Sequence, residues 1–96
     1  MSDIVNAAVT ALSEKLGGDT FDGSAKFNIE GEGSIVIDGT GVRASDDETE
    51  VTLTADADTF QEILDGDLNA TAAFMQGKLS VDGDMGVAMK LGSVLS

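Results

Sequence analysis

The apolar residues of this chain change their spacing after residue 16, and that change limits what the chain can fold into. In residues 3–16 they recur at steps of three and four, the period of one face of an α-helix. In residues 24–30 they alternate with polar residues, the period of a β-strand with one buried face. Both periods in one short chain predict a sheet packed against helices, the α+β class. The apolar positions of the first helix are Ile4, Val5, Ala8, Val9, Leu12 and Leu16.

Short elements separated by glycine and acidic residues follow the first helix. Three strands joined by glycine-containing turns are predicted first, then an acidic connection, a fourth strand, two short helices, a fifth strand and a final helix. The predicted strands cover residues 24–30, 34–38, 42–45, 50–55 and 78–82. This order predicts a sheet that helices cover on at least one face.

Polar residues that can cap a helix stand before each helix predicted in the second half of the chain. Asn69 precedes the short helix that ends at the next glycine, and Asp84 precedes the final helix. The helix predicted directly after the fourth strand has two candidate caps, Asp56 and Asp58. Asp58 together with Gln61 matches a capping box.

Length and composition predict one folded domain over residues 1–96. The chain has 42% hydrophobic residues and no proline, which is typical of a globule rather than of a disordered acidic tail. A chain of this size buries about 60–65% of its unfolded surface, so a cavity would take a large share of its core. No stretch approaches the roughly 18 apolar residues of a membrane span. Without a secretory or peroxisomal signal, a cytoplasmic location is expected.

Acidic residues outnumber basic residues along the whole chain. Eighteen Asp and Glu stand against five Lys and Arg, which gives a formal net charge of -13 at pH 7. Nucleic acids and anionic membranes attract clusters of Lys and Arg. Nucleic acid is therefore not expected as a partner, and membrane contact is expected to be transient.

The chain lacks the residues that most enzymes use. It has no His, Cys, Tyr or Trp, so the commonest general base and the best nucleophile are missing. Asp-Gly-Asp triplets at 65–67 and 82–84 are compatible with calcium binding in composition. The spacing from Asp56 to Asp67, however, places Gln61 where a calcium loop needs glycine. We therefore expect turns and caps at the triplets, and no catalysis, metal or cofactor.

The final predicted helix is apolar around nearly its whole circumference, and Lys90 is its only charge after the cap. Such a helix is normally buried, yet a small domain rarely surrounds an element at the end of its chain. A ligand, a second subunit or the other helices could cover its second face. Methionines concentrate in this quarter of the chain; flexible thioethers suit a cavity for variable apolar shapes, and they are also common in ordinary cores. The apolar positions of this helix are Met85, Val87, Ala88, Met89, Leu91, Val94 and Leu95.

The second half of the chain matches the pattern of a known family. From Val51 to Val94 it reads VTLTADADTFQEILDGDLNATAAFMQGKLSVDGDMGVAMKLGSV. This segment resembles the sterol carrier protein 2 family, the non-specific lipid-transfer proteins, in a free-standing bacterial-type form. The most specific parts are the helix ending AFMQGKL and the following VDGDMGVAMKL. The resemblance implies a mixed five-stranded sheet of order 3-2-1-4-5, covered by helices, with an apolar tunnel between helices and sheet.

The resemblance also implies a ligand class and a set of contacts. Family members bind fatty acids, fatty acyl-CoA, sterols and phospholipid-like molecules, so we expect non-catalytic lipid carriage in a cavity under the final helix. Lys78 and Lys90 are either partners of an anionic head or ordinary surface lysines. The residues expected in the wall, the lid or the neighbouring helix are Phe60, Ile63, Leu64, Phe74, Met75, Leu79, Met85, Val87, Ala88, Met89 and Leu91.

A second class of function stays open at this point. The apolar final helix could instead dock on another protein, or on a second copy of this chain, and make the domain an interaction module. The chain is accordingly expected to be a monomer or a weak dimer, with a lipid as its main partner.

Overall fold

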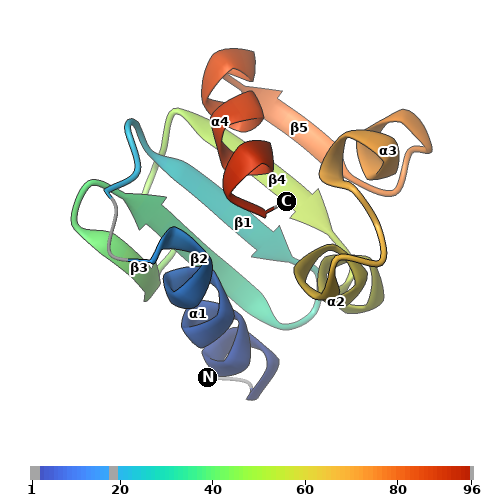
Figure 1. The fold of residues 1–96 in the computed structure, drawn as a ribbon, viewed down its shortest axis with the longest axis horizontal. Coiled ribbons are helices and arrows are strands. Elements are labelled where there is room, and N and C mark those ends of the chain that lie inside the picture. The colour runs from blue at the N-terminus through green and yellow to red at the C-terminus, as the bar shows by residue number, and fades with distance from the viewer. Residues whose placement is uncertain (1–2, 18–19, 96) are drawn as a thin grey trace.

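The computed structural model describes residues 3–17 and 20–95, and helices and strands follow one another there in the predicted order (Figure 1). The strands form one sheet of order β3-β2-β1-β4-β5, in which β1 pairs with β4 in parallel and all other pairs are antiparallel. The α+β class and the mixed sheet with this strand order are thereby confirmed. The elements are α1 (Asp3–Leu16), β1 (Ala25–Ile29), β2 (Gly33–Asp38), β3 (Gly41–Ala44), β4 (Val51–Ala55), α2 (Ala57–Asp65), α3 (Ala70–Met75), β5 (Ser80–Gly83) and α4 (Met85–Leu95).

The helices lie on one face of the sheet (Figure 1). Residues of β1 and β4 alternate between buried and half-buried, so every second side chain points into the layer between sheet and helices. Phe27 on β1 meets Phe60 on α2 there, with ring centroids 4.3 Å apart and a tilt of 58°. Tilted aromatic pairs at this distance add to the stabilisation from burial alone. Both side chains belong to the main hydrophobic core.

The connection from β3 to β4 runs past the opposite face of the sheet. Lys26 and Arg43 point to that face, where they pair with Asp46 at 3.1 Å and Asp47 at 3.3 Å in the connection. Both basic residues are also register neighbours of Val36, which is 1% exposed although it faces away from the helices. The long aliphatic stems of Lys and Arg can cover such an apolar neighbour while their charged ends stay in water.

The fifth strand begins later than the alternation in residues 78–82 predicts. The N–H groups of Lys78 and Leu79 both donate to the carbonyl of Ala73, at 2.9 and 3.2 Å, and close the end of α3. These donors are therefore not available to a strand, and β5 starts at Ser80. Leu79 is buried as expected, but in the bend that leads into the strand.

At the start of α2 the structure decides between the two candidate caps, and at the start of α1 it corrects one predicted core position. Asp56 is the cap of α2 and accepts a hydrogen bond from the N–H of Thr59 at 2.7 Å, so Asp58 lies inside the first turn and forms no capping box. Gln61 donates instead to Asp65 along the same helix. Ile4, in the first turn of α1, is 36% exposed and does not join the core. None of the helices in the described ranges is long and apolar enough to cross a membrane.

Candidate functional site

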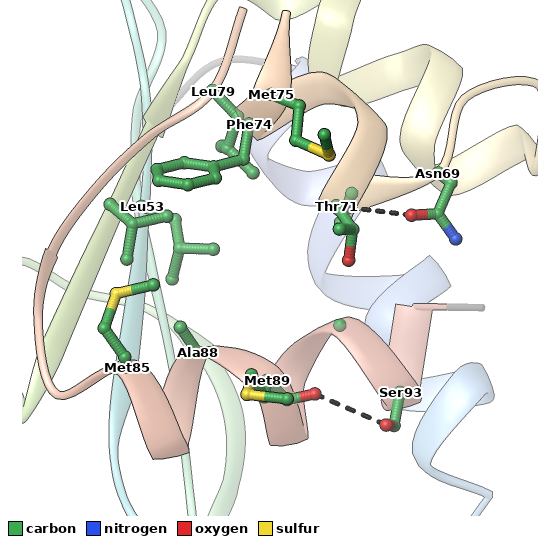
Figure 2. A pocket seen from close by; sticks show the side chains of 13 residues that line it. Leu53, Asn69, Thr71, Phe74, Met75, Leu79, Met85, Ala88, Met89 and Ser93 are labelled. Atoms are coloured by element: carbon green, nitrogen blue, oxygen red, sulfur yellow. Dashed lines mark hydrogen bonds between the residues drawn. The ribbon is translucent and has the colours of Figure 1, made fainter. Parts of the chain in front are cut away.

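A cavity of about 480 Å³ lies between α3, α4 and the edge of the sheet formed by β4 and β5 (Figure 2). Four large apolar side chains on its wall remain open to solvent: Phe74 is 44% exposed, Met85 50%, Met89 73% and Met75 80%. Apolar side chains that gather at one exposed site usually mark an interaction site. The lining residues are Leu53, Asn69, Ala70, Thr71, Phe74, Met75, Leu79, Val81, Met85, Ala88, Met89, Gly92 and Ser93.

The wall formed by α3 is fixed at the start and in the middle of that short helix. At its start, the side-chain oxygen of Asn69 accepts hydrogen bonds from the N–H groups of Thr71, at 2.8 Å, and Ala72, at 3.3 Å. In its middle, Ala73 is fully buried, and the small side chain lets the helix approach the core closely. Phe74 and Met75 follow Ala73 and lie on the side of α3 that lines the cavity.

The wall formed by α4 is placed by the turn that follows β5. The N–H of Asp84 donates to the carbonyl of Glu50 at 2.9 Å, and the Asp84 side chain caps α4 by accepting from the N–H groups of Gly86 and Val87. Gly83 has a φ of 119°, and a Cβ at this position would collide with the carbonyl oxygen of Glu50. Glycine is therefore required here for α4 to start beside the cavity. The predicted cap at Asp84 is confirmed.

The structure brings six of the eleven predicted site residues together and places five elsewhere. The six that line the cavity are Phe74, Met75, Leu79, Met85, Ala88 and Met89. The five that do not line it are Phe60, Ile63, Leu64, Val87 and Leu91. Leu64 is half-buried and packs against the hydrophobic core, whereas the other four are buried within it.

The lining residues that sequence reasoning missed include strand residues and neutral polar residues. Leu53 and Val81 belong to the strand alternation and were predicted as inward-facing, but nothing in that pattern shows that the layer above them is incomplete. Asn69, Thr71 and Ser93 supply neutral polar groups to the wall. The preference of Asn for caps explains Asn69 without reference to any ligand.

No charged side chain lines the cavity among the residues that the structure describes. Lys90 points to the connection before β1, where its Nζ pairs with the Asp22 carboxylate at 3.0 Å. Lys78 is exposed and lies near enough to Asp56 for its charge to act on that carboxylate. In the described part of the chain, no cluster of three or more His, Cys, Asp or Glu residues could hold a metal ion.

The carboxylates with perturbed pKa values lie outside the cavity. Hydrogen bonds from the hydroxyl and N–H of Thr40, followed by Arg43, lower the pKa of Asp38 to about 2 and fix the turn from β2 to β3. The hydrogen bond from the N–H of Thr59 lowers the pKa of Asp56 at the start of α2. Both shifts arise from local structure, a turn and a helix cap.

The sequence pattern of the SCP-2 sterol transfer family matches residues 8–96. The chain therefore belongs to the SCP-2 sterol transfer family, as its second half predicts. It is 42% identical over 65 residues to the peroxisomal multifunctional enzyme A of Dictyostelium discoideum. That match covers 68% of this chain and 14% of the enzyme. The same identity over 65 residues holds for sterol carrier protein 2 of Rattus norvegicus, covering 67% of this chain and 11% of the rat protein. The chain thus spans a small part of these relatives.

Solved structures show the same fold. The sterol carrier protein 2 like 2 of Aedes aegypti superposes with a TM-score of 0.78 at 22% identity, and 95% of each chain is covered. A second Aedes aegypti protein, sterol carrier protein 2 in complex with the C16 fatty acid palmitate, gives a TM-score of 0.76 at 26% identity. That match covers 100% of this chain and 97% of the mosquito protein.

Proposed function

We propose that this chain binds and carries lipids in the cavity between α3, α4 and the β4–β5 edge. The observation that supports this most strongly is the convergence of four exposed apolar side chains on one cavity. This apolar site contrasts with the strongly negative net charge of the chain as a whole. A volume of about 480 Å³ falls within the range of about 300–1,000 Å³ common for small-molecule sites. Family membership and the palmitate complex of the mosquito relative support a lipid as the occupant.

Burial of the apolar tail supplies the driving force in this proposal. If about 300 Å² of ligand surface leaves water, the contribution is roughly 7 kcal/mol at about 25 cal/mol per Å². This contribution alone corresponds to a dissociation constant of roughly 7 μM, and the cost of ordering ligand and side chains weakens the affinity from that value. Flexible methionines at the wall fit acyl chains and sterol-like rings alike, so a broad class of lipids is accepted.

The proposed contacts begin with the six predicted residues that line the cavity. For Phe60, Ile63, Leu64, Val87 and Leu91, ligand contact stays a prediction, and it requires the cavity to deepen toward the core when a ligand enters.

Residues 1–96 act as one carrier unit in this proposal. The carrier unit works in the cytoplasm as a monomer or weak dimer, contacts membranes transiently and catalyses no reaction.

Substitution of a wall residue by a carboxylate tests the proposal. In Met85→Glu, a charge enters the apolar wall, and desolvation of that charge should weaken binding of a fluorescent acyl probe at least tenfold. Ile4→Glu is the matched control, because Ile4 is also an exposed apolar helix residue but lies on α1 and does not line the cavity. Circular dichroism of both variants shows whether the fold survives.

Three outcomes would count against lipid carriage. Equal probe affinity in both variants would remove the cavity from the binding site. A purified protein that takes up no probe and releases no lipid into organic solvent would contradict the function itself. Concentration-dependent dimerisation that Met85→Glu abolishes, in protein free of lipid, would favour the interaction module.

A further inference from the structure

We propose that the cavity selects lipids with a neutral, hydroxyl-bearing head over lipids with a carboxylate or phosphate head. This inference rests on the proposed lipid-binding function and narrows its substrate class. It follows from the arrangement of polar groups in the wall, from the orientation of α4 and from the position of the nearby charges.

The cavity has an apolar end and a polar end (Figure 2). In this view Asn69 and Ser93 lie on the side away from Leu53 and Met85, and Thr71 lies nearer the middle of the cavity. Met85 is the first residue of α4 and Ser93 lies eight residues further, about 12 Å along the helix axis. An amphiphile that buries its tail against Leu53 and Met85 therefore brings its head to the polar end.

The polar end offers hydrogen bonds suited to a hydroxyl group. The Asn69 side-chain oxygen already accepts from the backbone N–H groups of Thr71 and Ala72, so these two amides are not available to an anion. Ser93 donates its hydroxyl to the carbonyl of Met89 at 3.3 Å and keeps acceptor capacity for a ligand. A lipid hydroxyl can both donate to and accept from neutral polar side chains such as those of Asn69, Thr71 and Ser93 at this end, whereas a carboxylate can only accept.

The electrostatic environment at this end disfavours a negative charge. Ser93 lies near the C-terminal end of α4, where the helix dipole places about half a negative charge, and the last turn carries no basic residue. Neither lysine compensates, because Lys90 is paired with Asp22 and Lys78 does not line the cavity. The net charge of -13 repels anionic ligands in addition.

Two fluorescent probes with the same polyene tail, cis-parinaric acid and cis-parinaryl alcohol, provide the test. Near neutral pH and at low salt, we expect the alcohol to bind at least tenfold more tightly than the acid. Added salt should improve binding of the acid and leave the alcohol almost unchanged, because it screens repulsion between exposed charges.

A new cation at the polar end separates electrostatics from shape. In Ser93→Lys, affinity for the acid should rise at least threefold, so that the preference for the alcohol shrinks. Thr10→Lys, an exposed site on α1 outside the cavity lining, adds the same charge to the chain and should leave the preference as it is. Circular dichroism confirms the fold of each variant.

The outcomes distinguish selectivity from lipid binding itself. Acid that binds as tightly as alcohol would overturn the selectivity and leave the lipid carrier intact. Equal responses to Ser93→Lys and Thr10→Lys would show that the head does not lie at the polar end, which also overturns it. Failure of both probes to bind would contradict lipid carriage and the selectivity together.

Discussion

The helical layer closes over one half of the sheet and leaves the other half open. In the closed half, α1 packs on β2 and β3 and α2 packs beside it with Phe60 on Phe27 of β1, and large apolar residues are buried, such as Leu12 at 0% and Phe60 at 1% exposure. In the open half, α3 and α4 stand over β4 and β5, and Phe74 and Met89 keep 44% and 73% of their surface exposed. The same layer thus contributes stability on one side and an interaction surface on the other.

The difference follows from the length and composition of the helices. The 14 residues of α1 place Val5, Ala8, Leu12 and Leu16 on one face, enough to cover two strands. The six residues of α3 bury Ala73, so this helix anchors with a methyl group and leaves its larger side chains outside. A cavity can therefore exist without a destabilised core, because the four large exposed side chains of its wall lie outside that core.

Truncation of one phenylalanine in each half should give the largest contrast. Phe60→Ala removes a ring that packs at a tilt against Phe27 and should lower the free energy of unfolding by about 3–5 kcal/mol. Phe74→Ala should change it by less than about 0.5 kcal/mol and weaken acyl-probe binding instead. Urea unfolding and probe titration of both variants measure the two effects, and equal destabilisation would remove the distinction between the halves.

The turn that joins β5 to α4 should give an intermediate effect. Gly83→Ala places a Cβ against the carbonyl of Glu50 at a φ that L-residues avoid, so stability should fall by at least about 2 kcal/mol. Gly92→Ala is the control, because it lies within α4 and a Cβ there meets nothing within 4 Å. It should gain about 0.5–1 kcal/mol from helix propensity. Thermal unfolding distinguishes them, and a neutral Gly83→Ala would show that α4 has another anchor.

The smallest effect is expected from the acid titration of the α2 cap in the closed half. The pKa of Asp56 is lowered in the folded chain, mainly by the N–H of Thr59. Its stabilisation is therefore complete above the unfolded pKa, about 3.9, and is lost as pH falls through the lower folded value. Asp56→Asn keeps an acceptor that does not titrate, so its stability should fall less than that of the native chain below about pH 4.

Urea midpoints of the two proteins across this acid range provide the measurement. Identical pH dependence in both would exclude Asp56 as a source of acid sensitivity. Probe binding at neutral pH should be the same in both, since Asp56 lies outside the cavity lining.

Local pattern predicts the fold well where one periodicity dominates. Residues 25–29 and 51–55 alternate without exception, and both form strands within a residue of the predicted bounds. Prediction failed where two elements compete for the same donors, as at Leu79, whose N–H closes α3 instead of starting β5. That competition depends on backbone geometry at the end of α3, which apolar spacing does not encode.

The site was predictable as a region but not as a set of contacts. On α4, Val87 and Leu91 enter the core while Met85 and Met89 face the cavity, and all four are apolar. A helix that is apolar on every side carries no signal for which side meets the sheet. Leu53 shows the same limit, because its inward direction follows from alternation and the gap above it depends on how far α3 and α4 stand apart.

The exposed thioethers of Met75 and Met89 make the cavity wall sensitive to oxidants. Solvent reaches 80% and 73% of these side chains, so peroxides reach the sulfur atoms as well. Oxidation to the sulfoxide makes a flexible apolar side chain polar. The core, which contains neither residue, is untouched by that reaction. Air-aged protein would therefore keep its secondary structure while its cavity wall loses apolar character, and binding measurements depend on the oxidation history of the sample.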